Sequence, residues 1–311
     1  MSLLPRLDLA AADPYPRDET AFHPALREIC ARHGLPSGTL ARFSGGSVPV
    51  FGVGRHAVKL FPPQFREAAA TEAAALAAAH GKLGLPTPGP VAVGELEGWG
   101  YVVMERLPGV VLQDVWEEVP DDARREMCLR LGAAVARLHA LPLDGLEVPA
   151  PDWDAFVRRQ AETCVARQRE KGLAEHWLEQ IPGFLASVAL GSRRRALLHT
   201  EVMRHHLLAE RRAGVWELTG LFDFEPAMVG DPEYELGSVG IFVTDGSPAL
   251  FRAFLRGYGW ARAEWGPALQ RRTLAYTLLH RYSNLRWYLE ILPPRSAATL
   301  DALAAEWFPL A

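Results

Sequence analysis

Two hydrophobic periods divide this chain of 311 residues into a front part with the character of strands and a longer back part with the character of helices. Residues 38–61 alternate apolar and polar positions around glycine-containing turns at 45–46 and 54–55, which predicts three antiparallel strands. Residues 63–84 are rich in alanine and predict a helix, and the prolines within residues 85–90 would end it.

Residues 91–109 predict a hairpin that turns at Glu97–Gly98. The front part should therefore form a small lobe of five antiparallel strands with one crossing helix. Beyond Leu107 the apolar residues recur at helical spacing, as Met127 and Leu131 do. Further helical patterns lie at residues 153–170, 173–190, 248–258, 264–290 and 296–306.

One segment of the back part, residues 197–224, breaks the helical pattern and predicts a loop followed by a β-hairpin. We therefore predict an α+β protein with a bilobal, protein-kinase-like plan. By its resemblance to that plan, the chain should have an N-terminal β-rich lobe that binds nucleotide, over residues 1–107. Residues 108–311 should form a helical C-terminal lobe with a catalytic loop and an acceptor site.

Composition narrows the class of protein and its partners. Lysine and arginine number 33 against 37 acidic residues, and this net charge of −4 argues against a nucleic-acid surface, which is usually strongly basic. The three cysteines have no CxxC spacing, which favours a reducing compartment. No apolar run approaches the roughly 20 residues of a membrane span. We expect a cytoplasmic protein without a nucleic-acid or membrane partner, and abundant alanine and arginine hint at a bacterial source.

A lysine and a glutamate in the front part have the spacing of a phosphate anchor. Lys59 ends an apolar strand, and Glu72 lies on the following helix thirteen residues later (72 − 59). A kinase uses a buried lysine, held by a helix glutamate, to aim an ammonium group at nucleotide phosphates. Taken alone, a strand lysine more often extends to the surface along its apolar stem.

Two other segments could face phosphates. Ser44, Gly45, Gly46 and Ser47 could offer backbone N–H groups, although a Gly-Gly pair between strands is usually only a turn. Asp223 directly follows the apolar strand "LTGLF", where a carboxylate would suit Mg²⁺.

The segment "LLHTEVMRHHLLAE" holds three histidines, the first of which, His199, lies 24 residues ahead of that acid (223 − 199). Together with "FDFE" and "GDP" it resembles the aminoglycoside phosphotransferase family of small-molecule kinases. That family carries H-G-D-x-x-x-x-N, then a hairpin, then I-D-[WF]-E and G-D-P. Front-end segments such as "SGGSVPVFGVG" and "GYVVMERLPG" match as well, so the resemblance covers roughly residues 38–290.

The resemblance implies a fold, a reaction and cofactors. The fold would be kinase-like, and the reaction would move the γ-phosphate of ATP or GTP, with Mg²⁺, to a hydroxyl group of a small molecule. An aminoglycoside-like acceptor is one candidate.

The resemblance also assigns roles by position. Lys59 and Glu72 match the phosphate anchor. Glu105 and Leu107 match the hinge, whose backbone would bind adenine, and Met104 would line the adenine pocket.

Acidic and histidine positions of the motifs match as well. Asp223 corresponds to the Mg²⁺-binding acid, and His199 to the structural histidine that opens the catalytic loop. Asp231, in "GDP", would brace that loop.

Two positions of the loop depart from the family pattern. Glu201 stands where the family has its catalytic aspartate, and the extra methylene moves the carboxylate by ~1.5 Å, a shift that can cost about 10²-fold in rate. His206 replaces the Mg²⁺-binding asparagine, although Mg²⁺ does not favour an imidazole nitrogen. We still predict that Asp223 and His206 hold the metal. Arg204 could act as a fork-shaped phosphate donor.

Two other functions stay open at this point. The chain could bind nucleotide without turnover, as an impaired kinase. His199, Glu201 and either His205 or His206 could instead form a metal site like that of a 2-oxoglutarate oxygenase. Aromatic and acidic residues are candidates to line an acceptor site, although aromatic residues at helical spacing are usually core: Trp153, Trp177, Tyr282, Trp287, Tyr288, Asp152, Asp154, Asp245 and Glu290.

Overall fold

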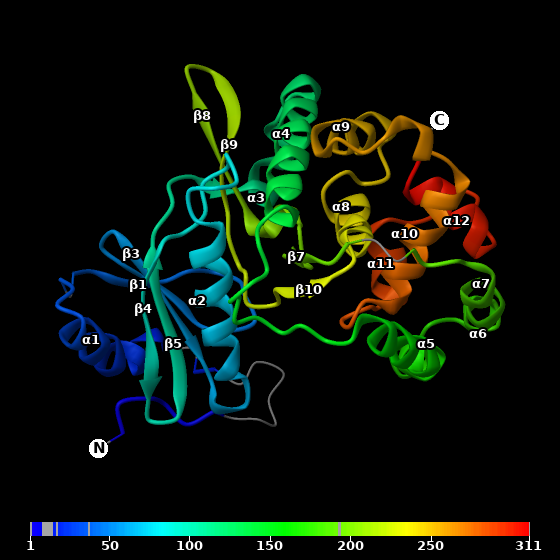
Figure 1. Ribbon diagram of the computed structural model, residues 1–311. Coiled ribbons are helices and arrows are strands. Elements are labelled where there is room, and N and C mark those ends of the chain that lie inside the picture. Colours follow the sequence, from blue (N-terminus) through cyan, green and yellow to red (C-terminus); the bar gives the residue numbers. More distant parts are fainter. Residues whose placement is uncertain (1, 8–14, 17, 37, 192–193, 311) are drawn as a thin grey trace.

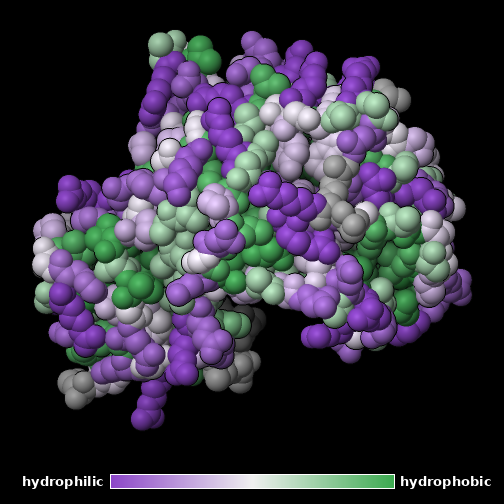
Figure 2. Space-filling model, in the orientation of Figure 1, coloured by the Kyte–Doolittle hydropathy of each residue, from purple (hydrophilic) through white to green (hydrophobic). Residues whose placement is uncertain are grey.

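The computed structural model describes residues 2–7, 15–16, 18–36, 38–191 and 194–310. A small lobe built around an antiparallel sheet lies beside a larger, mainly helical lobe (Figure 1). The space-filling surface mixes hydrophilic and apolar side chains, and its outline is indented between the small lobe and the lower part of the large one (Figure 2). The predicted α+β, kinase-like architecture is confirmed.

The small lobe contains the five strands that the hydrophobic pattern predicts. They pair antiparallel in the order β1-β2-β3-β5-β4. Their bounds are β1 Leu40–Arg42, β2 Val50–Val53, β3 His56–Phe61, β4 Pro90–Leu96 and β5 Trp99–Glu105.

Both faces of this sheet are covered, so all six residues of β3 are buried. Because strand side chains alternate between faces, Val58 and Leu60 join the core beneath α1 (His23–Arg32). Phe61 joins the core on the side of α2 (Glu67–Ala79). Lys59, of the same parity as Phe61, is therefore directed toward α2.

Small residues let α2 approach the sheet closely. The helix is a run of alanines broken by a few larger residues, and it begins directly over Gly100 in β5. A Cβ atom at Gly100 would lie 2.6 Å from the carbonyl oxygen of Arg66. This close approach brings Glu72, in the middle of α2, over the lysine of β3.

The large lobe is mainly helical, and its long helix α4 (Asp121–His139) packs against α9 (Pro248–Tyr258). Its other helices are α3 Leu112–Val115, α5 Trp153–Glu170, α6 Glu175–Leu178, α7 Ile181–Ser187, α8 Leu236–Phe242, α10 Pro267–Leu279, α11 Leu285–Ile291 and α12 Leu300–Trp307. The predictions at 153–170 and 248–258 are confirmed, and α12 begins four residues later than the predicted 296. The sequence did not predict α8.

Two predicted helices are each broken into two. The pattern at 173–190 divides between α6 and α7, where Pro182 starts the second helix. The pattern at 264–290 breaks between α10 and α11, because Asn284 caps a new helix by accepting from the N–H of Trp287. This break matters for function, because the loop between α10 and α11 carries His280 and Tyr282.

Two short sheets place loops at the junction of the lobes. β7 (Ala196–Leu198) pairs with β10 (Met228–Gly230), and the predicted hairpin is present as β8 (Leu207–Arg212) and β9 (Val215–Leu221). β6 (Val110–Val111) adds to β8. Within the described residues, no helix combines the length and apolar character needed to cross a membrane.

The contact between α4 and α9 gives a stability prediction. A Cβ atom at Gly132 would lie 2.1 Å from the carbonyl oxygen of Phe254, so Gly132→Ala must push the two helices apart. We expect it to lower the free energy of unfolding by about 1–3 kcal/mol, measured by urea denaturation. Gly183 in α7 is the matched control, because nothing lies within 4 Å of the position that a Cβ atom would take there. Gly183→Ala should raise stability by up to about 1 kcal/mol, and equal losses would contradict this account of the contact.

Candidate active site

A buried ammonium group lies where the two lobes meet. The Nζ atom of Lys59 is 3.0 Å from a carboxylate oxygen of Glu72 and 2.9 Å from one of Glu225, and it also bonds to Asp223. The lysine comes from β3, Glu72 from α2, and the other two acids from the segment after β9. The predicted pairing of Lys59 with Glu72 is therefore present. Glu225 was missed, although it is the last residue of "FDFE".

The charges of this cluster do not balance. Burial alone would lower the pKa of Lys59, but Asp223, Glu72 and Glu225 together raise it well above its usual value. The lysine therefore stays protonated. Burial raises the pKa of Glu72 despite the nearby lysine. Three carboxylates thus face one ammonium, and their oxygens lie within 4.8 Å of one another.

His206 lies on the other side of Asp223. Its Nε2 atom is 3.0 Å from Oδ2 of Asp223, and its Nδ1 atom is 2.8 Å from the carbonyl oxygen of Glu201. Burial opposes ionisation of Asp223, but Lys59 and His206 hold its pKa well below the usual value. The two residues predicted to hold a metal are therefore brought together.

The predicted catalytic loop follows β7, and its backbone is fixed from two sides. His199 donates from Nε2 to the carbonyl oxygen of Phe222, and its Nδ1 accepts from the N–H of Glu201. Burial lowers the pKa of His199 to about 4, so its ring is neutral. The N–H groups of His199 and Thr200 both donate to the carboxylate of Glu235.

Glu235 is a second residue that the sequence analysis missed. It follows "GDP" by only a few residues and was visible in the sequence, but nothing in the motif assigned it a contact with the loop. Asp231, the acid expected to brace the loop, caps the next helical turn by accepting from the N–H of Glu233. The bracing contact therefore comes from Glu235.

Thr200 is a third departure from the family loop, because the family has glycine there. Its φ angle is 72°, in the left-handed region that a β-branched residue rarely adopts. Its Oγ1 atom donates to the carbonyl oxygen of Pro226, and its own carbonyl accepts from Nε2 of His280. A backbone strained in this way costs about 1–3 kcal/mol of folding free energy, and these hydrogen bonds help to offset that cost.

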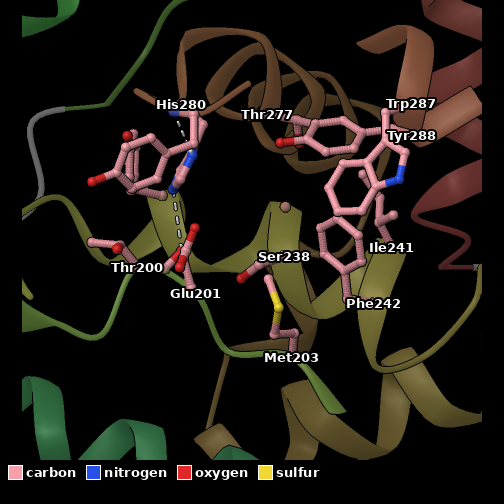
Figure 3. Close-up of a pocket in the computed structure, with 13 residues that line it drawn as sticks. Thr200, Glu201, Met203, Ser238, Ile241, Phe242, Thr277, His280, Trp287 and Tyr288 are labelled. Carbon is pink, nitrogen blue, oxygen red and sulfur yellow. Dashed lines mark hydrogen bonds between the residues drawn. The ribbon is translucent and has the colours of Figure 1, made fainter. Parts of the chain in front are cut away.

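Glu201 borders a pocket in the large lobe. Figure 3 shows Glu201 and Thr200 on one side and Phe242, Trp287 and Tyr288 on the other. The cavity has a volume of about 60 Å³. Among the described residues that line the pocket, Glu201 is the only acid. Burial raises the pKa of Glu201, which makes its carboxylate a stronger base.

The pocket sorts the residues expected to line an acceptor site. Tyr282, Trp287 and Tyr288 do line it. Trp153 packs in a buried aromatic group with Tyr234, and Trp177 is also buried in the core.

The four acids expected at this site have other partners. Asp152 caps α5 by accepting from Ala155, and Asp154 pairs with Arg195. Glu290 pairs with Arg286 of the same helix. The fourth acid, Asp245, pairs with an arginine of the catalytic loop.

That arginine, Arg204, does not take the position expected of a phosphate donor. It is buried, pairs with Asp245, and donates to the side-chain oxygen of Gln113 at 3.0 Å. Its guanidinium group also lies over the ring of Trp116, at 4.9 Å from the centroid. Through these contacts Arg204 holds the catalytic loop in place.

The expected nucleotide side of the site lies along the small sheet. Ser44, Gly45, Gly46 and Ser47 form an exposed bend between β1 and β2, and both glycines have positive φ angles. β2 begins three residues after this bend, at Val50, which is the register partner of Lys59.

The expected hinge residues lie at the end of β5 and just beyond it. Met104 is buried in the core and Glu105 is exposed. The side chain of Leu107 packs over Gly220 of β9.

An oxygenase-like metal site finds no support in this geometry. Both ring nitrogens of His199 are bonded within the chain, and His205 is exposed. Within the parts of the chain that the structure describes, the group of at least three side chains whose ligand atoms lie close enough to share a metal ion is Glu72, Asp223 and Glu225, and it contains no histidine.

A small antiparallel lobe, a helical lobe and a lysine–glutamate pair beside a strand-end acid define the protein-kinase-like class. The chain belongs to the phosphotransferase enzyme family (APH), whose sequence model matches residues 45–268. The resemblance stated from the motifs is therefore confirmed.

Individual relatives agree with this assignment. Viomycin phosphotransferase from Streptomyces vinaceus is 29% identical over 197 residues, which cover 58% of this chain and 63% of that protein. The match thus spans less than two thirds of that relative.

Solved structures share the fold at low identity. The GDP complex of aminoglycoside 2'-phosphotransferase-IIIa has a TM-score of 0.69 at 19% identity, covering 86% of this chain and 96% of that one. Macrolide 2'-phosphotransferase MphH from Brachybacterium faecium has a TM-score of 0.60 at 24% identity, covering 92% and 98%.

The buried histidines give a pH prediction. Burial, helped by positively charged Arg281, lowers the pKa of His280 to about 3. Below about pH 6.5 His280 therefore binds a proton in the unfolded chain but stays neutral in the folded chain. The contribution of His280 to the free energy of unfolding is therefore lost as the pH falls. We expect His280→Gln, which keeps a donor for Thr200, to reduce proton uptake on unfolding near pH 5 by nearly one.

The measurement is the free energy of unfolding as a function of pH, from urea denaturation. His176→Gln is the control, because this histidine is exposed on α6. An unchanged slope for His280→Gln would show that His280 does not titrate in this way.

Proposed function

We propose that the protein transfers the γ-phosphoryl group of ATP or GTP to a hydroxyl group of a small molecule. One observation carries this proposal: the Lys59–Glu72 pair and Asp223 lie on one side of the loop, and Glu201 opens onto a pocket on the other. A phosphate anchor and a base beside a pocket are the parts that phosphoryl transfer requires.

The nucleotide would lie against the small sheet. Lys59 would contact the α- and β-phosphates, held by Glu72, and the backbone of residues 44–47 would cover them. At the hinge, Glu105 gives its N–H to the carbonyl of Gly89, so its contact with adenine would run through its carbonyl oxygen. Met104 and Leu107 would border the base.

The surplus of carboxylates supports a divalent cation. Asp223 fits this role, and Glu225 lies beside it. The family's ion is Mg²⁺, which prefers oxygen ligands, so the imidazole of His206 is an unusual second ligand for it. When bound, the cation would neutralise charge on the transferred phosphate.

Glu201 would act as the base. The acceptor hydroxyl would give its proton to the Glu201 carboxylate as its oxygen bonds to the γ-phosphorus. The bond between that phosphorus and the β–γ bridging oxygen would break, and the nucleoside diphosphate would leave with that electron pair. The raised pKa of Glu201 suits this proton transfer.

The pocket favours an acceptor with a largely apolar body. Its aromatic wall of Phe242, Trp287 and Tyr288 offers stacking surface. A polycationic aminoglycoside would find a single carboxylate there, Glu201. Macrolides, the substrates of the phosphotransferase MphH, come closer to a largely apolar acceptor than aminoglycosides do.

Nucleotide binding is the first test. ATP or GTP with a divalent cation should raise the melting temperature, because a ligand that binds only the folded state stabilises it. Lys59→Met should remove most of this rise by deleting the phosphate anchor, as measured by differential scanning fluorimetry. Circular dichroism of the variant is the control for folding. If neither nucleotide shifts the wild type at millimolar concentration, the proposal fails.

Acceptor-dependent release of nucleoside diphosphate is the second test. We would screen macrolides, aminoglycosides, viomycin and amino sugars, and we expect acceptors with an apolar body to give the highest turnover. Glu201→Gln keeps the size of the side chain but removes the base, so it should lower turnover by about 10²–10⁴-fold with little change in nucleotide affinity. Unchanged turnover would assign the proton transfer to another group.

A further inference from the structure

We propose that Nε2 of His206 is a metal ligand, and that the site therefore prefers a transition-metal ion such as Mn²⁺ to Mg²⁺. This inference rests on the proposed function, because the ion would be held together with nucleotide phosphates. It concerns one position of the loop, where an imidazole stands in place of the family's amide oxygen.

The ring of His206 is held in the orientation of a metal ligand. A carbonyl oxygen can only accept, so the 2.8 Å contact with Glu201 requires the hydrogen to be on Nδ1. In a neutral ring Nε2 then carries the lone pair. Metal-binding histidines commonly donate their other ring nitrogen to a carbonyl or carboxylate in this way. The side chain is also only 13% exposed, which limits its rotation.

The lone pair of Nε2 faces an atom that would repel it. Oδ2 of Asp223 lies 3.0 Å from Nε2, and two acceptors at that distance need a positive charge between them. A proton can supply it, and so can a cation bound to both.

The chemistry of the two ligands decides which ion is favoured. Mg²⁺ binds oxygen almost exclusively and gives up its water reluctantly. Imidazole suits first-row transition metals, and Mn²⁺ combines tolerance of a nitrogen ligand with affinity for carboxylate and phosphate oxygens. Asp223 and His206 offer one ligand of each kind, whereas an asparagine at position 206 would offer oxygen only.

The neighbouring histidine provides a built-in control. His205 is adjacent in sequence and exposed, whereas the contacts of His206 point it at Asp223. His205→Asn and His206→Asn therefore remove the same group from adjacent positions, and only the second should alter the metal site.

The experiment uses the full chain with Mn²⁺ and a non-hydrolysable ATP analogue at about pH 8, where a free imidazole is neutral. Pulsed electron paramagnetic resonance detects ¹⁴N of a coordinated imidazole as a modulation of the Mn²⁺ echo. We expect this modulation in the wild type and in His205→Asn, and its loss in His206→Asn. Competition with Mg²⁺ should show the preference for Mn²⁺ falling about tenfold or more in His206→Asn only.

The outcomes separate this inference from the proposed function. If the analogue and Mn²⁺ bind together without ¹⁴N modulation in the wild type, His206 is not a ligand and the inference is overturned, while the proposed function stands. The same holds if His206→Asn leaves the Mn²⁺ preference unchanged. If the analogue does not bind with either metal, the proposed function fails, and this inference fails with it.

Discussion

The ammonium group of Lys59 sets the condition that the rest of the site must meet. A buried charge costs several kcal/mol unless it is paired, and its partners come from α2 and from the segment after β9. The alternation of side chains along β3, the alanines of α2 and Gly100 beneath that helix bring Glu72 within reach of the lysine. Movement of the large lobe away from the small one would separate the lysine from Asp223 and Glu225, so the cluster is also an electrostatic contact between the lobes.

Local patterns predicted the elements of the fold and much of the site. The strands, the hairpin at Glu97–Gly98, and the spacing of Lys59 and Glu72 follow from periodicity and loop length alone. Contacts between distant residues did not follow. From the sequence, Arg204 looked like a loop cation that could bind phosphate. In the structure it pairs with Asp245 and lies over the ring of Trp116, and no rule of residue spacing predicts these two contacts.

The acceptor side shows a different limit of sequence reasoning. An acidic side chain near a helix readily pairs with a nearby arginine, as Glu290 does, or caps the helix, as Asp152 does. The acidic residues expected at the acceptor site therefore do not line the pocket. Aromatic residues predicted the lining of the pocket better than acidic residues did, where they follow a break between two helices. Trp287 and Tyr288 reach the pocket because the chain breaks before α11, whereas Trp153, at the start of a long helix, is buried in the core.

The strained backbone of Thr200 has a consequence for how this loop could have evolved. Glycine there would relieve the strain but would lose the bond to Pro226, while His206 orients itself on the carbonyl of Glu201. His206 thus orients itself on a backbone carbonyl that any residue at position 201 would supply, whereas Thr200 is tied to Pro226 and His280. A lineage could therefore exchange the side chain at position 201 without removing the hydrogen bond that orients the imidazole at position 206.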